Sequence, residues 1–149
     1  MTIEEVIKSS VVLHPMERSV LNIIYSGYLV EERLSEKLKP YGLSIQQYNV
    51  LRILRGQKGN PINLFGIQER MISKMSNTTR LVDKLVFKDW AHRQVCPENK
   101  RKVEITITEA GLKVLNELDV LVKMTHIEIL KNLSLQELDT LNGILDKLK

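Results

Sequence analysis

The 149-residue chain predicts a mainly α-helical fold with a small two-stranded β wing. Apolar residues recur at helical spacing through most of the chain, and this pattern changes to extended alternation only over 90–108. Two short helical patterns, over 64–71 and 73–88, come directly before the extended segment and are separated by a tight turn. Helix, turn, helix and hairpin in this order predict a winged helix-turn-helix, here flanked by N- and C-terminal helices.

The predicted helices before this unit have ordinary start and stop signals. A long helix over 16–38 ends before Pro40, which breaks helices. Ser44 is predicted to cap the next helix, because Gln47 follows three residues later and completes a capping box. Gly56 ends that helix.

The two short helices have caps of their own. Asn63 is predicted to cap the helix over 64–71, and Ser73 is predicted to cap the helix that follows. Helical spacing predicts the buried face of this second helix to consist of Thr78, Leu81, Val82 and Leu85.

The extended segment is predicted to form two strands, over 90–95 and 102–108, joined by turn residues at 97–100. Thr108 then caps a long helix, and a second capping box at 134–137 begins the last helix. The second strand is rich in β-branched residues, which is typical of a wing hairpin.

The composition is that of a folded globular chain, with 43% hydrophobic and 27% charged residues. No apolar run approaches the ~20 residues of a membrane span, and the acidic N-terminus does not resemble a signal peptide. We therefore expect a cytoplasmic protein with no membrane partner. The single cysteine, Cys96, cannot form an internal disulfide, which agrees with a reducing compartment.

Positive charge is concentrated in the middle of the chain. The net charge is +4, but residues 52–102 hold 12 Lys and Arg against 4 acidic residues, a local charge of +8. The remaining residues carry −4. This segregation predicts a polyanionic partner such as double-stranded DNA. The alternative is that these Lys and Arg residues only make helix faces soluble and bind no partner.

The long first helix and the last two helices carry more apolar residues than a small winged-helix core can cover. We expect them to form a homodimer interface, and folding back onto the core of a monomer is the alternative. The chain is then a single domain, 1–149, with a winged helix-turn-helix part at about 44–108 and dimerisation helices at about 10–40 and 109–149. Two-fold symmetry would suit a pseudo-palindromic DNA site.

Several motifs occur in a characteristic order: LSIQQYNVL at 43–51, SNTTRLVDKL at 76–85, Arg93, NKR at 99–101 and TITEAG at 106–111. Together they resemble the MarR family of bacterial transcriptional regulators. The resemblance implies a homodimer of winged helix-turn-helix subunits, usually a repressor, that releases a pseudo-palindromic operator when a small ligand binds. Two departures are Asn99 where the family's wing usually has aspartate, and Asp89 where the helix before the wing usually ends in glycine.

The resemblance also implies the DNA-contacting residues. The recognition helix would present short hydrogen-bonding and cationic side chains to the major groove, namely Lys74, Ser76, Asn77, Thr79, Arg80 and Lys84. The wing would present cations to the minor groove or its phosphates, namely Arg93, Lys100, Arg101 and Lys102.

Tyr25, Tyr28 and Tyr48 lie on helices that, in the resembling family, border a cleft for phenolic or other amphipathic effectors. They are candidate ligand contacts, and the alternative is that they are core aromatics. No cofactor is expected beyond such an effector.

Other functions have weaker support in the sequence. Cys96 near the basic wing suggests a redox-sensing regulator as one alternative, and a winged-helix assembly module without specific DNA binding is another. The three histidines lack ligand spacing with Cys96, so no metal site is predicted. No catalytic nucleophile, carboxylate pair or phosphate loop is present, and we expect no enzyme activity.

Overall fold

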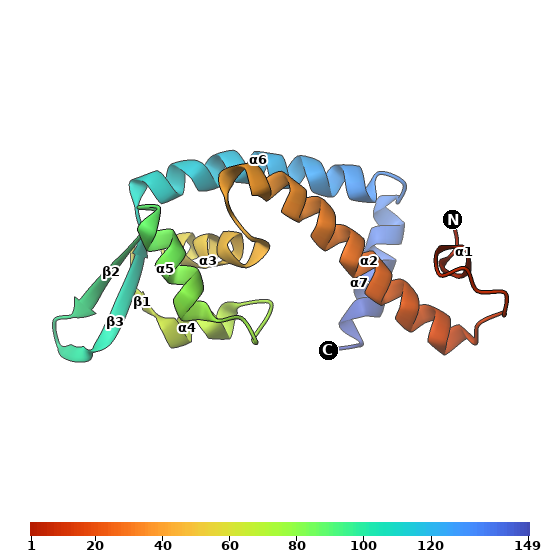
Figure 1. Cartoon of the computed structure of the whole chain (residues 1–149), viewed down its shortest axis with the longest axis horizontal. Coiled ribbons are helices and arrows are strands. Elements are labelled where there is room, and N and C mark those ends of the chain that lie inside the picture. The colour runs from red at the N-terminus through yellow and green to blue at the C-terminus, as the bar shows by residue number, and fades with distance from the viewer.

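The α6 helix (Glu109–Leu130) runs along most of the molecule and connects its two ends (Figure 1). The computed structural model describes all 149 residues except the side chains of Lys100 and Arg101. One end holds α3, α4, α5 and the sheet, and the other holds α7 and the N-terminal part of the chain (Figure 1). In chain order the remaining elements are α1 (Ile3–Val6), α2 (Pro15–Leu38), the 3₁₀ helix η1 (Lys39–Tyr41), α3 (Ile45–Gly56), β1 (Ile62–Asn63), α4 (Leu64–Arg70), α5 (Thr78–Phe87), β2 (Ala91–Cys96), β3 (Asn99–Ile107) and α7 (Leu135–Asp146).

The wing sheet has three antiparallel strands in the order β1-β3-β2, so the prediction of only two strands was incomplete. β2 and β3 pair from Ala91 opposite Ile107 to Val95 opposite Val103, where an irregularity interrupts the register. β1 adds two residues, with Ile62 opposite Ile105. A two-residue strand cannot show alternation, and its Ile62 is fixed in place by the buried Ile105 beside it.

The core lies at the sheet end of the molecule, where α3 packs against α4, α5 and the N-terminal half of α6. Its completely or almost completely buried side chains include Leu38, Val50, Leu51, Leu54, Ile67, Val82, Leu85, Ile105, Leu115 and Leu118. Three of the four residues predicted for the buried face of α5 are buried, and Leu81 is half-buried. The core therefore holds the helix-turn-helix and the wing on one end of α6.

Four of the predicted helix caps are confirmed. Ser44 Oγ accepts a hydrogen bond from the Gln47 backbone amide at 3.2 Å, and the Gln47 side-chain oxygen accepts one from the Ser44 backbone amide at 2.8 Å. Asn63 caps α4, Thr108 caps α6, and the capping box at the start of α7 is also present. Each cap satisfies amides that the first turn of a helix would otherwise leave without partners.

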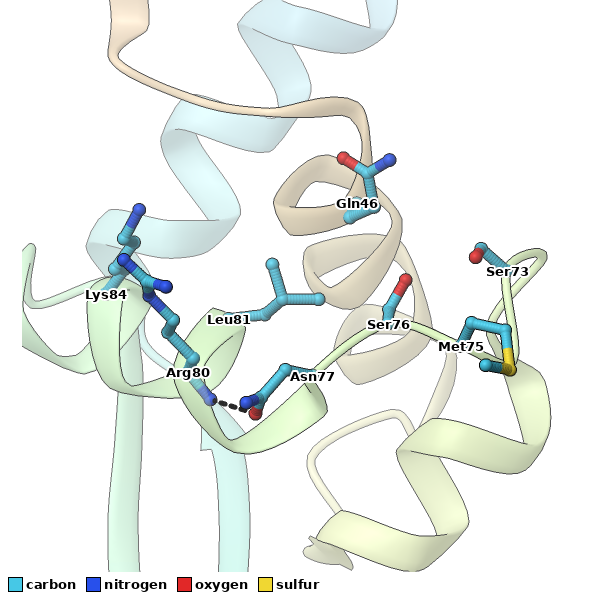
Figure 2. A pocket seen from close by; sticks show the side chains of 8 residues that line it. All are labelled: Gln46, Ser73, Met75, Ser76, Asn77, Arg80, Leu81 and Lys84. Carbon is cyan, nitrogen blue, oxygen red and sulfur yellow. Dashed lines mark hydrogen bonds between the residues drawn. The ribbon is translucent and has the colours of Figure 1, made fainter.

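The start of α5 was predicted wrongly. Ser73 does not cap it; the chain turns at 73–76, and α5 begins at Thr78 with Asn77 as its cap. The Asn77 Oδ1 accepts from the Arg80 amide at 3.1 Å (Figure 2). Both residues are good caps, and the turn ahead of Asn77 leaves only the second in position.

The terminal helices bury little of their own apolar surface. No residue of α7 is buried, and α2 buries only Leu38. Large apolar side chains exposed along α2, the C-terminal half of α6 and α7 include Val20, Ile23, Ile24, Val120, Met124, Ile127, Leu141 and Ile144. Nothing in the described chain folds back to cover them. No helix in the described part is both long enough and apolar enough to cross a membrane.

Candidate nucleic-acid interface

The N-terminal end of α5 borders a surface pocket of about 290 Å³ (Figure 2). Gln46 of α3 lies on one side of this pocket, and the α4–α5 turn and α5 lie on the others. The lining residues are mostly polar: Gln46, Ser73, Met75, Ser76, Asn77, Arg80, Leu81 and Lys84. The first turn of α5 has no acidic residue, so the partial positive charge of the helix start is not offset there. An anionic group such as a DNA phosphate is favoured at such a place.

Arg80 and Lys84 are the cations that dominate this surface. They lie one turn apart on α5, and both are exposed. Both also line a second pocket of about 350 Å³, which reaches Gly42 and the exposed Phe87. Arg80 and Lys84 therefore lie between two neighbouring pockets, and both side chains are accessible to solvent.

The other residues predicted for the recognition helix have different positions. Lys74 and Ser76 lie in the turn before α5, not in the helix, and the ammonium group of Lys74 donates to the carbonyl of Glu69. Asn77 caps the helix, and this gives it a structural task in addition to any contact with DNA. Thr79 is exposed in the first turn of α5.

The wing residues are also placed unequally. Arg93 on β2 reaches back to α5, where its Nη2 lies 2.6 Å from Asp83 Oδ1, and its Nε and Nη2 atoms are shielded from solvent. Lys102 is exposed on β3. The side chains of Lys100 and Arg101, which were predicted to contact DNA, lie outside the described residues.

Other cations of residues 52–102 have contacts within the chain. Arg55 Nη1 donates to Asp119 Oδ2 of α6 at 2.5 Å, and the guanidinium of Arg52 lies 5.9 Å from the centre of the Tyr48 ring. Lys88 packs over the Trp90 ring at 4.8 Å. A charge count along the sequence cannot show which cations are already paired within the chain. For Arg55, the partner Asp119 lies 64 residues away in sequence.

The three tyrosines proposed as ligand contacts have different surroundings. Tyr48 is buried, and its hydroxyl donates to Asp119 Oδ1 at 3.1 Å. Burial raises the pKa of Tyr48, and the hydrogen bond to Asp119 raises it further. Tyr28 is exposed on α2 and donates to Glu32 at 3.3 Å, and the negative charge of Glu32 raises the pKa of this phenol. Tyr25 is half-buried on the same helix.

Cys96 is buried at the end of β2, with 9% of its surface exposed. A redox sensor needs an accessible thiol, so this position does not favour that alternative. Among the described side chains, no three His, Cys, Asp or Glu residues are close enough together to hold a metal ion.

Comparison with known proteins gives one consistent result. Residues 43–103 match the sequence profile of the MarR family. The multiple antibiotic resistance protein MarR of Escherichia coli is 32% identical over 117 residues, which cover 76% of this chain and 78% of that protein.

Solved structures agree with this match. A mutant E. coli MarR in complex with operator DNA superposes with a TM-score of 0.75 at 28% identity, covering 85% of this chain and 89% of that one. A MarR transcription factor from Planctomyces limnophilus superposes with a TM-score of 0.73 at 29% identity, covering 91% and 98%. The chain therefore belongs to the MarR family, whose members are transcriptional regulators and not enzymes.

Proposed function

We propose that this chain binds double-stranded DNA sequence-specifically, as a homodimer on a pseudo-palindromic operator, and acts as a ligand-responsive repressor. The observation that carries the proposal is the N-terminal end of α5. There Arg80 and Lys84 lie exposed beside the unneutralised start of a helix. The E. coli relative bound to operator DNA supports the same partner for this chain.

In this proposal α5 is the recognition helix and enters the major groove. Bases and phosphates there are contacted by Lys74, Ser76, Asn77, Thr79, Arg80 and Lys84. The wing clamps the neighbouring minor groove with Lys100, Arg101 and Lys102, and Arg93 serves the wing from its base, where Asp83 holds it. Arg80 can make bidentate contacts to guanine, whereas a lysine on a wing gains mainly from phosphate charge.

The terminal helices supply the dimer interface, with about 10–40 and 109–149 as dimerisation segments around a winged helix-turn-helix at about 44–108. A second copy of this chain carries the same exposed apolar side chains, so a two-fold contact covers both sets at once. The alternative in which these helices cover their own core would need buried residues in α2 and α7, but α7 buries none and α2 buries only Leu38.

Ligand response requires that an effector bind one dimer conformation better than another. We propose Tyr25 and Tyr28 on α2 as contacts for a small phenolic or amphipathic ligand. Tyr48 is less accessible to a ligand than these two residues, because a ligand that binds its hydroxyl has to displace Asp119. Release of the operator then follows from a shift in the populations of DNA-competent and incompetent dimers.

The test is fluorescence anisotropy with DNA from upstream of the protein's own gene and with a scrambled duplex, each over a range of salt concentrations. We expect selective binding to the upstream DNA, with a steep salt dependence that corresponds to roughly 6–10 phosphate contacts per dimer. Loss of all binding at low salt would instead favour an assembly module, and equal binding to both duplexes would contradict sequence specificity.

Two substitutions separate the proposed roles. Arg80→Ala should lower affinity for the specific duplex by roughly 1–3 kcal/mol and relax selectivity, because a base contact is lost. Lys102→Ala should weaken binding to both duplexes about equally and reduce the salt slope by about 2, because the dimer loses one phosphate contact in each subunit. Lys8→Ala, at an exposed lysine outside the DNA-binding part and the dimerisation segments, is the matched control and should change neither. Equal specific binding by the wild type and Arg80→Ala would contradict the assignment.

A further inference from the structure

A polar seam joins α3 to α6 beside the apolar core. Tyr48, Arg52 and Arg55 are spaced four and three residues apart, so they lie along one face of α3. That face meets Asn116 and Asp119, which are three residues apart on α6. The seam therefore connects the first helix of the helix-turn-helix to the long helix that leads to the other end of the molecule.

Asp119 is the centre of this seam because each of its two carboxylate oxygens has a different partner. Oδ1 accepts from the Tyr48 hydroxyl at 3.1 Å, and Oδ2 accepts from Arg55 Nη1 at 2.5 Å. Arg55 also reaches Asn116 Oδ1 at 3.5 Å. Two donors from different turns of α3 fix both the position and the plane of one carboxylate, whereas the neighbouring apolar contacts are non-directional.

The exposures of the three side chains indicate what the seam contributes. The Asp119 and Arg55 side chains are 35% and 34% exposed, so solvent screens their attraction and little stability follows from it. The Tyr48 side chain is buried, and its hydroxyl needs this acceptor. A contact of modest strength and strict geometry is better suited to setting an orientation than to holding the fold together.

We propose that Asp119 is a positioning residue that fixes the orientation of the DNA-binding end relative to α6. In the dimer of the proposed function, on which this second statement rests, the same contact fixes the separation of the two α5 helices and hence the half-site spacing that the protein accepts. Tyr48 and Arg55 act through Asp119 and do not need to touch DNA.

Pulsed electron paramagnetic resonance tests the orientation within one chain. Spin labels are placed at Phe87→Cys in α5 and Glu128→Cys in α6, both exposed sites, in a Cys96→Ser background. The labelled protein is diluted with unlabelled protein so that only distances within a chain are measured. Asp119→Ala and Tyr48→Phe should each broaden the distance distribution, and Tyr48→Phe keeps the test valid if Asp119→Ala folds poorly.

The matched control is Asp146→Ala, which removes an ion pair of 2.6 Å between the last residue of α7 and Lys149. It should leave the distribution as narrow as in the labelled parent. A distribution of unchanged width in both seam variants would overturn the proposal, even if their melting temperatures fall, because that is the result expected of a purely stabilising contact.

A DNA-binding experiment tests whether Asp119 fixes the accepted half-site spacing. Duplexes that bind the wild-type protein are first enriched from a random-sequence library. Each is then resynthesised with one base pair added or removed between the half-sites. The wild type should bind the original duplex more tightly than the duplexes with altered spacing. This ratio of affinities should be roughly fivefold smaller for Asp119→Ala. An unchanged ratio would overturn the spacing claim. If the wild type enriches no duplex, the proposed function fails, while the label distances still decide the role of Asp119.

Discussion

Arg93, at the base of the wing, is held by an ion pair within the chain and is therefore less available to contact DNA than an unpaired arginine would be. Arg93 is one-third exposed and lies 2.6 Å from Asp83, with its buried Nε beside α5. We expect Arg93→Ala and Asp83→Ala to be coupled in a double-mutant cycle, by about 0.5–1 kcal/mol of unfolding free energy, since the pair is only partly buried. Urea denaturation of the four proteins measures this coupling, and additive effects would show that the pair contributes nothing.

Tyr48 gives a second test at the scale of one residue. Burial and the bond to Asp119 raise its pKa above the ordinary value of 10.0. A pKa that is raised on folding contributes stability below the unfolded-state value and loses that contribution as the pH rises through the folded-state value. We expect an ultraviolet titration of the four tyrosines to show a late-ionising component that Tyr48→Phe reduces, while the contribution of Tyr28 to that component remains. A normal titration of all four would contradict the buried hydrogen bond.

At the scale of elements, the junction between the wing and α6 depends on Gly111. A Cβ atom at this position would lie 2.1 Å from the backbone carbonyl oxygen of Trp90, which itself accepts a hydrogen bond from the Thr108 amide. Backbone cannot move aside as a flexible side chain can. We expect Gly111→Ala to destabilise the protein by about 1–3 kcal/mol in thermal or urea unfolding.

Gly143 in α7 is the matched control for this substitution. Nothing lies within 4 Å of a Cβ built there, and the residue is in the interior of a helix. Gly143→Ala should therefore stabilise the protein by about 0.5–1 kcal/mol. Equal effects of the two substitutions would show that the contact with Trp90 does not matter.

Elements with short-range signals were predictable from the sequence, and those fixed by distant contacts were not. Ser44 and Thr108 were recognised as caps because the residues that complete a cap lie within three positions. β1 was missed because only pairing with β3 makes it a strand. Asp89, which stands where the family usually has glycine, follows α5 with a φ of 58°, a left-handed conformation that glycine adopts freely and Asp tolerates better than most residues.

The candidate site was predictable only in part, for the same reason. The exposed positions of Arg80 and Lys84 follow from helical spacing, which the sequence shows. The ion pairs of Arg93 with Asp83 and of Arg55 with Asp119 depend on tertiary structure, and both change what those cations are available to do. No local pattern in the sequence contains that information.

For the whole molecule, the proposed dimer makes a direct prediction about mass. Ile127 is 62% exposed in the C-terminal half of α6, among the apolar side chains that a second copy would cover. We expect Ile127→Asp to give monomers in light scattering, because burying a carboxylate in such an interface is costly. Phe65→Asp, at an equally exposed apolar residue of α4, should leave the dimer intact. A dimeric Ile127→Asp protein would place the interface elsewhere.

Because α6 is one unbroken helix, a small change in its tilt displaces its far end by several ångströms. α6 continues to Leu130 beyond the contact of Asp119 with α3, a length of about 17 Å at about 1.5 Å per residue. A tilt of about 12° at that contact therefore displaces the far end of α6 by about 3.4 Å, roughly the step between base pairs in DNA. Substitutions near that meeting point can alter which DNA is recognised without any change in the residues that touch it.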